Sequence, residues 1–357
     1  MANAETAQSP EFKFRSSLVL NGLDKEQAAG FLRHQAEHHN LSLTQSSDGQ
    51  LECVTPFGIV RLDTSGASPS LSIEAPSADI LYAIQEDITS HLSELSETLA
   101  SALTWSSIFS VGDYPPNFRL AEVVSVGRVN PIYTRVRIKA DKLGNFANAG
   151  MHFRLIIPAS GAVETDVYPV IGDNGQTVWP KGDKALHRPV YTTRAIDPAK
   201  GWLEFDVFHH DGGRANAWTK TAQPGTRLAL MGPGGGTLLD TDKIVMAGDE
   251  TALPAISRIL RHLPATATGK VFMLVSDETE QVEITAPEGI ELNWLHRSEA
   301  RPRQLLQAVT ALPDQAPGTY AWFASEKSEV KAARAHFTAQ GWFDKEQSYL
   351  AAFWTAH

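Results

Sequence analysis

Cysteine and long apolar runs are scarce in this chain. Cys53 is the single cysteine among 357 residues, which excludes a disulfide framework and any iron–sulfur cluster held only by cysteines of the chain. No stretch reaches the length of a membrane span, and the opening residues, MANAETAQSPEFKFRSS, lack an apolar run behind positive charges. We therefore expect a cytoplasmic protein without membrane insertion.

Net positive charge is also lacking. The chain contains 31 Lys and Arg against 41 Asp and Glu, so its formal net charge is -10. This balance argues against nucleic acid as a partner, because phosphate backbones are bound by basic surfaces. An anionic ligand would need a local basic patch. The length suits two or three domains, and a hydrophobic content of 42% is typical of a soluble protein.

The first part of the chain predicts a small α+β domain of unknown function at residues 11–97. Its expected elements are a strand at 12–20, a helix at 24–38, strands within 51–62 and 71–74, and a helix at 77–95. His34 and His38, with His39 beside them, have the i, i+4 spacing of a metal site. A solvated helix face explains them better, because spacing indicates no third ligand. Residues 98–117, which include SSIFSVGDYPPN, are expected to form a linker.

The rest of the chain predicts two further domains, so the fold class is multidomain α+β and α/β. Residues 118–238 contain short β-rich runs and one helix near 215–222, as in an antiparallel β-barrel. Residues 239–357 alternate strand and helix, which indicates a parallel sheet covered by helices. A ligand is then expected at the carboxyl ends of the strands, where GDET, HRS and ASE occur.

The most informative motif is MAGDETALPAISR, from Met246 to Arg258. An apolar run leads into a glycine turn and then a helix, with Asp249 or Thr251 as its cap and Pro254 in its first turn. Such a helix N-terminus suits the phosphate or ribose of a dinucleotide. A βα unit that only packs in the core is the alternative interpretation.

A second constellation precedes it. HRPVYTTR offers an aromatic ring for a planar cofactor, hydroxyls for its edge, and Arg188 or Arg194 for a phosphate. HHDGGRANAWT makes another glycine turn into a helix, with Asn216 as the expected cap, and MGPGGG follows. Taken singly, Tyr191 and Trp218 are better explained as core aromatics than as cofactor contacts.

These blocks carry a resemblance to a known family. From about Arg119 to Trp354 the chain resembles the siderophore-interacting proteins, flavin reductases of ferric siderophores within the ferredoxin-NADP reductase superfamily. The matching blocks are YTTR, DVFHHDGGRANAWT, PGTRLALMGPGG and AGDETALPAISRIL, followed by WLHR and YAWFASE. The chain departs from the family pattern at Pro189, Arg214, Asn216 and Ser325, and its end, SYLAAFWTAH, lacks a basic residue that the family often has.

The resemblance implies FAD as the cofactor and NADPH or NADH as the electron donor. Thr192 would lie near flavin N5 and Tyr191 would pack on the ring, and no acid or base residue is implied. The implied FAD contacts are Arg188, Tyr191, Thr192, Thr193, Arg194, His209, Gly213, Ala215, Asn216, Trp218 and Thr219. The implied nicotinamide-side contacts are Gly248, Asp249, Glu250, Thr251 and Glu326.

The implied substrate is a ferric siderophore, whose Fe(III) is loosened by one-electron reduction. The candidate contacts for this anionic chelate are Arg154, Arg297, Arg301, Arg303 and Lys331. Arg297 could instead hold an NADP 2′-phosphate, whereas the acidic Asp277 and Glu278 would favour NADH. Two alternatives stay open: the same flavin reductase fed by ferredoxin, and a siderophore carrier without catalysis.

Overall fold

A computed structural model describes residues 12–38, 41–46, 49–55, 57–106, 108–210, 212–298, 303–313, 315–341 and 347–356. The chain forms two compact units: residues 1–117 with 169–178, and residues 118–168 with 179–357. Within the described ranges, no helix combines the length and apolarity that crossing a membrane requires.

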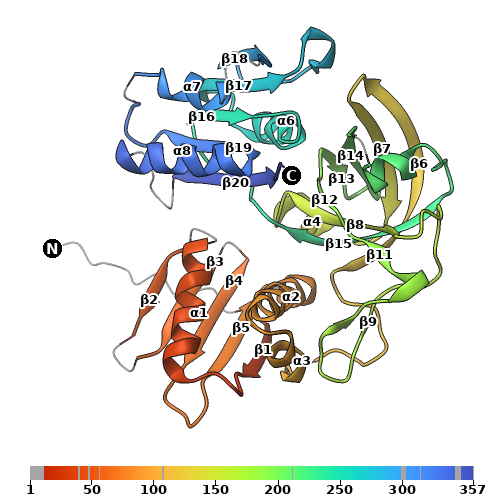
Figure 1. Ribbon diagram of the computed structural model, residues 1–357, viewed down its shortest axis with the longest axis vertical. Coiled ribbons are helices and arrows are strands. Elements are labelled where there is room, and N and C mark those ends of the chain that lie inside the picture. The colour runs from red at the N-terminus through yellow and green to blue at the C-terminus, as the bar shows by residue number, and fades with distance from the viewer. Residues whose placement is uncertain are drawn as a thin grey trace. The chain divides into compact units, whose positions relative to one another are not determined.

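The first unit is built on a five-stranded antiparallel sheet in the order β1-β5-β4-β3-β2. Its elements are β1 (Phe14–Val19), α1 (Lys25–His38), β2 (Leu43–Gln45), β3 (Leu51–Thr55), β4 (Gly58–Asp63), β5 (Ser70–Ala75), α2 (Ala78–Leu95) and α3 (Glu97–Ala102). Both long helices lie on one face of the sheet (Figure 1). Strand residues alternate accordingly: Leu71 and Ile73 are buried, whereas Arg61 on the opposite face pairs with Glu52 at 2.6 Å.

Residues 98–117, expected as a linker, contain the end of α3, and neither α3 nor β2 was predicted. A hairpin of β9 (Val170–Ile171) and β10 (Thr177–Val178) groups with this first unit. Gln176 Nε2 donates to the carbonyls of Ala100 at 2.7 Å and Leu103 at 2.9 Å, and Trp105 N–H donates to Asn174 O at 3.1 Å. The segment is therefore held by contacts distant in sequence, which turn propensities do not reveal.

The second unit begins with the predicted antiparallel barrel. Its strands are β6 (Phe118–Asn130), β7 (Tyr133–Ala140), β8 (His152–Pro158), β11 (Leu186–His187), β12 (Val190–Thr192), β13 (Ala195–Asp197), β14 (Trp202–Phe208) and β15 (Arg227–Gly234), with α4 (Gly144–Asn148) and α5 (Arg214–Thr219). The strand order is β11-β8-β15-β6-β7-β14-β13, and β12 pairs with β8. Arg194 N–H donates to Glu204 O at 2.8 Å, which links the end of β12 to β14 and closes the sheet around its core.

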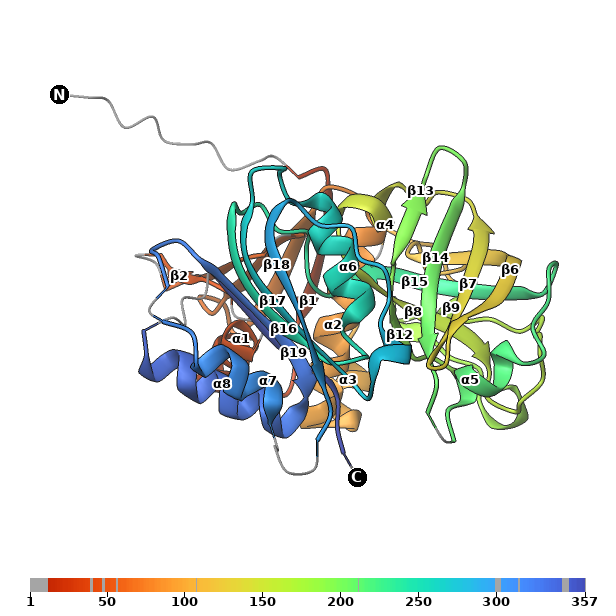
Figure 2. The same ribbon diagram turned by 90° about the horizontal axis from the view of Figure 1, so that it is seen from above.

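The unit ends in the predicted α/β domain. It comprises β16 (Lys243–Gly248), α6 (Leu253–His262), β17 (Thr268–Val275), β18 (Gly289–His296), α7 (Gln304–Thr310), β19 (Tyr320–Glu326), α8 (Lys327–Ala339) and β20 (Ser348–Trp354). The sheet is fully parallel, in the order β18-β17-β16-β19-β20. Figure 2 shows α6 on one face and α7 with α8 on the other. The order reverses between β16 and β19, so the crevice for a ligand opens after Gly248 and Glu326.

Candidate functional site

The strand β12 carries the predicted flavin contacts Tyr191 and Thr192. It pairs antiparallel with β8, so that Tyr191 faces Phe153 and Thr192 faces His152 across the ladder. The Tyr191 ring lies 5.3 Å from that of Phe205, and burial raises the pKa of its hydroxyl. Tyr191 is therefore packed against the barrel core while remaining partly accessible, as a ring that also stacks on a cofactor needs to be.

Two threonine hydroxyls of this segment are buried in contrasting ways. Thr192 Oγ1 lies 3.1 Å from His152 Nδ1, whereas Thr193 Oγ1 has no hydrogen-bond partner among the described residues. Burial, followed by the charge of Arg258, lowers the pKa of His152 to about 4, so the imidazole is neutral at pH 7. A Cβ at Gly235 would lie 2.6 Å from His152 Cδ2, which explains glycine in the MGPGGG turn.

The two candidate phosphate arginines differ in their partners. Arg188 lies over the Trp179 ring, 4.1 Å from its centroid. Arg194 pairs with Asp206 at 3.2 Å and Glu204 at 3.7 Å, and burial is the largest cause of its lowered pKa. The carboxylates that already compensate Arg194 leave its guanidinium less able to bind a phosphate.

The second glycine turn leads into α5, and Gly213 rather than Asn216 occupies the N-cap position. The prediction that Asn216 caps this helix is wrong, because the N-cap lies three residues earlier and Asn216 Nδ2 donates to His210 O at 3.3 Å. Ala215 and Trp218 lie in the barrel core, and Trp218 Nε1 donates to Val163 O at 3.0 Å. A helix of six residues also has only a small dipole to offer an anion.

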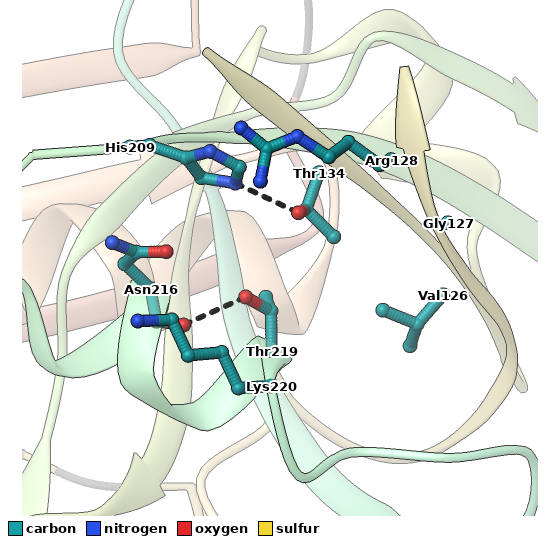
Figure 3. Close-up of a pocket in the computed structure, with 8 residues that line it drawn as sticks. All are labelled: Val126, Gly127, Arg128, Thr134, His209, Asn216, Thr219 and Lys220. Atoms are coloured by element: carbon teal, nitrogen blue, oxygen red, sulfur yellow. Dashed lines mark hydrogen bonds between the residues drawn. The ribbon is translucent and has the colours of Figure 1, made fainter. Parts of the chain in front are cut away.

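A hollow of about 330 Å³ opens beside α5 (Figure 3). Its lining comprises Val126, Gly127, Arg128, Thr134, His209, Asn216, Thr219 and Lys220. His209 Nε2 lies 2.7 Å from Thr134 Oγ1, and burial is the largest cause of the lowered pKa of His209. Arg128 donates to carbonyls of its own hairpin, and neither it nor Lys220 has a carboxylate partner among the residues that the structure describes.

His209, Asn216 and Thr219 were predicted from the sequence as cofactor contacts, whereas the two cations, Arg128 and Lys220, were not. Arg128 is on β6, nearly ninety residues before α5, and no local motif connects the two segments. The hollow is therefore more basic than the motif alone indicates.

The GDET turn lies at the carboxyl end of β16, as predicted. A Cβ at Gly248 would lie 2.6 Å from Ala252 Cβ, so glycine allows α6 to approach the strand. The expected side-chain cap is wrong: Ala252 is the N-cap and no side chain caps the helix. Asp249 instead accepts hydrogen bonds from Thr251 N at 3.0 Å, Thr251 Oγ1 at 2.6 Å and Trp354 Nε1 at 2.7 Å.

Carboxylates surround this helix N-terminus. Glu250, which is 5% exposed, pairs with Arg297 Nη2 at 2.6 Å, and its backbone carbonyl accepts from the Tyr133 hydroxyl. Burial raises the pKa values of both Asp249 and Glu250. Two acidic groups at this edge repel a phosphate, so the turn suits the ribose or the cationic ring of a nicotinamide better than the anion first expected.

The end of β19 contributes helix capping. Glu326 accepts from Ser328 N at 2.6 Å and so caps α8, while the buried Ser325 hydroxyl donates to Glu329 Oε2 at 3.2 Å. Hydrogen bonding to Ser328 lowers the pKa of Glu326. Glu326 remains at the ligand edge of the sheet, but both of its oxygens are engaged, because Oε1 also accepts from Ala356 N at 3.3 Å.

The candidate siderophore contacts come from separate elements. Arg154 is exposed on β8 of the barrel, whereas Arg297 follows β18, Arg303 precedes α7, and Lys331 lies on α8. Arg297 is engaged with Glu250, while Arg303 and Lys331 are exposed. Arg301 lies outside the described residues.

The histidine pair of the first unit gains no support as a metal site. His34 and His38 are on α1, and His39 is outside the described residues. No group of three His, Cys, Asp or Glu side chains suited to a metal ion occurs within the ranges that the structure describes.

Arg258 is a further residue that sequence analysis missed. It projects from α6 and is 2% exposed. Its Nη1 donates to Thr193 O at 3.0 Å, directly after β12, the strand that carries the predicted flavin contacts. A charged residue on the otherwise apolar stripe of Ala255 and Ile259 was the available signal.

Both domains of the second unit match known protein families. A family model described as a siderophore-interacting FAD-binding domain matches residues 122–237, and one described as a siderophore-interacting protein matches residues 241–357. Ferric vibriobactin reductase ViuB of Vibrio cholerae is 32% identical over 250 residues, covering 66% of this chain and 89% of that protein. The NADPH-dependent ferric-chelate reductase of Escherichia coli is 30% identical over 247 residues, covering 67% and 93%.

Solved structures agree. A siderophore utilization protein from T. fusca has a TM-score of 0.59 and 31% identity, covering 69% of this chain and 95% of that one. SipS from Aeromonas hydrophila, a siderophore-interacting protein, has a TM-score of 0.56 and 26% identity, covering 67% and 99%. On its sequence matches, its barrel and its parallel-sheet domain, the chain belongs to the siderophore-interacting protein family.

Proposed function

We propose that this protein is an FAD-dependent reductase that passes electrons from NADPH or NADH to the Fe(III) of a siderophore, releasing Fe(II) for iron assimilation. The observation that carries the proposal is a direct contact between two segments. Arg258 of α6, the helix after the GDET turn, donates to Thr193 O at 3.0 Å, directly after β12, the strand with the predicted flavin contacts. A reductase requires this proximity, because hydride transfer needs the nicotinamide and the flavin in contact.

The residues present fit FAD. Among the described residues, the buried Thr193 hydroxyl has no partner, and the adjacent Thr192 hydroxyl is held by a neutral His152, so polar atoms are available to the edge of a planar ring. The basic hollow beside α5, with Arg128 and Lys220, suits a diphosphate. When bound, FAD supplies the ability to accept a hydride and to release electrons singly.

We assign the nicotinamide side to the GDET edge. Asp249 and Glu250 are held by Thr251, Trp354 and Arg297, so their carboxylates have fixed orientations for ribose hydroxyls or a carboxamide. The acidic surroundings also favour the positive charge of the oxidised nicotinamide.

Iron is the substrate in this proposal. Relatives named as ferric vibriobactin, ferric acinetobactin and ferric-chelate reductases support the substrate class. Reduction to Fe(II) weakens hard oxygen ligation and so releases the metal. Arg154, Arg301, Arg303 and Lys331 are our proposed contacts for the anionic chelate, and Arg297 would join them only when its pair with Glu250 opens.

The test is an anaerobic comparison of reductants. Purified protein containing FAD is mixed separately with NADPH, NADH and reduced ferredoxin, the flavin absorbance is followed, and a ferric siderophore is then added. We expect bleaching by a nicotinamide donor and recovery of the colour as Fe(II) forms. Bleaching by reduced ferredoxin alone would show that ferredoxin, not a nicotinamide nucleotide, is the electron donor. A protein that stays colourless with added FAD would refute the assignment as a reductase and favour a siderophore carrier.

A further inference from the structure

Arg258 is a buried cation whose hydrogen-bond acceptors are all backbone carbonyls. Nη1 donates to Thr193 O at 3.0 Å and Met151 O at 3.4 Å. Nη2 donates to Phe146 O at 3.0 Å and Ala147 O at 2.9 Å. Among the residues that the structure describes, no carboxylate lies within ion-pair distance of this guanidinium. Its full positive charge is therefore retained inside the protein.

An uncompensated buried charge is costly, because the protein interior solvates it less well than water does. Here burial, followed by repulsion from Arg261, lowers the pKa of Arg258 to about 10, which still leaves it protonated at pH 7. The neighbouring helix residues Ala255 and Ile259 are buried and apolar, and the four carbonyl acceptors are dipoles that carry no net negative charge. The charge thus points to an anion that is supplied from outside the chain.

The hydrogen bonds of Arg258 place its charge beside the strand that carries the predicted flavin contacts. Thr193 O follows Thr192, and Met151 O precedes His152, so Arg258 holds the backbone on both sides of the Thr192–His152 hydrogen bond. His152 itself experiences the field of Arg258. Because His152 is neutral, the hydrogen-bonded pair of Thr192 and His152 carries no charge, and Arg258 supplies the positive charge beside it.

We propose that Arg258 is a positioning residue for bound FAD, whose buried charge favours the reduced flavin over the oxidised flavin. The inference rests on the proposed function. Hydride transfer from NADPH to the flavin breaks a C–H bond of the nicotinamide and adds two electrons and one hydrogen nucleus to the ring. NADPH becomes NADP⁺, and the flavin gains one negative charge. A fixed cation in a medium of low dielectric stabilises that charge and raises the reduction potential.

The test is the reduction potential of FAD bound to the full-length protein, measured by equilibration with redox dyes. Arg258→Gln removes the charge but keeps an amide donor, and we expect the reduction equilibrium to fall about tenfold, or about 30 mV for a two-electron couple. Arg258→Lys keeps the charge but loses the planar guanidinium with its two donating nitrogens. The reduction potential of this variant is expected to stay close to that of the wild type.

Arg261→Gln is the matched control. Arg261 lies one turn further along α6 and donates to the carbonyls of Ser257 and Arg194, but it is exposed, so solvent screens its charge. Its loss should leave the potential unchanged. If Arg258→Gln does not fold, Arg258→Met supplies a second neutral variant.

Equal shifts in Arg258→Gln and Arg258→Lys would show that contact geometry, not charge, sets the potential, and would overturn the inference. A wild-type potential in a neutral variant would overturn it as well. Neither result concerns the reductase assignment, which fails only if the protein binds no FAD or transfers no electrons.

Discussion

Two glycine turns lead into helices in this protein, and their electrostatic surroundings are opposite. The turn before α5 borders a hollow with two cations, Arg128 and Lys220, that have no carboxylate partner among the described residues. The turn before α6 is bordered by the buried carboxylates of Asp249 and Glu250. In sequence both turns had the same appearance, a glycine followed by a helix, and both indicated an anion.

The comparison teaches that a helix N-terminus does not by itself choose its ligand. At α5 the helix is too short for a strong dipole, and side chains from β6 and α5 provide the positive charge. At α6 the ten-residue helix has the stronger dipole, but the chain supplies its own anions there. We infer a diphosphate at the first turn and a ribose or nicotinamide at the second.

Reversing charge at the first turn should have the largest effect. In the double variant Arg128→Glu, Lys220→Glu we expect the Kd for FAD to rise about a hundredfold or more, because two charge-assisted contacts are lost and replaced by repulsion. The Kd is measured by titrating the flavin-free protein with FAD. Lys200→Glu, in an exposed turn and paired with Asp197, is the control for single charge reversal. Unchanged FAD affinity in the double variant would show that the diphosphate lies elsewhere.

Acid should destabilise the second unit through His152, whose imidazole is buried beside Thr192. Above pH 6.5 the imidazole is neutral in the folded and the unfolded chain, so it adds no pH dependence. Between pH 6.5 and about 4 the unfolded chain takes up a proton that the folded one does not. Stability should therefore fall with falling pH, by about 3 kcal/mol in all.

The measurement is the apparent Tm of the second unit against pH. His152→Gln is expected to flatten the decline over this range, whereas His262→Gln, exposed at the end of α6, should not. An unchanged slope in His152→Gln would contradict the assignment of a buried neutral histidine.

Breaking the ion pair at the second turn should have a smaller effect. Arg297→Ala leaves the Glu250 carboxylate buried without its partner, and we expect a loss of about 2 kcal/mol, since the arginine is partly exposed. Urea unfolding of the single variants and of the double variant Glu250→Gln, Arg297→Ala measures the coupling. If the double variant loses as much as the sum of the two single variants, the pair contributes nothing.

Most of the architecture of the second unit was predictable, because strand and helix periods and glycine turns are local signals. AGDETALPAISR was located correctly at the end of a buried strand. The helix caps were wrong at both turns: Asn216 lies inside α5, and Asp249 bonds Thr251 and Trp354 instead. Capping depends on where the helix starts, and a shift of one to three residues reassigns every side chain around it.

By itself, the sequence determined the order of the domains, the family, and the segments that approach the cofactor. Only the tertiary structure decided which charges are free to act there. Arg194 and Arg297 were candidate ligand contacts, yet each has a carboxylate partner on another strand or turn. Arg258, hidden within an apolar helix, has none among the described residues and keeps its charge beside the flavin strand. The reason is physical: the net charge of a side chain's surroundings depends on partners that folding brings together from distant positions, and local sequence patterns carry no record of them.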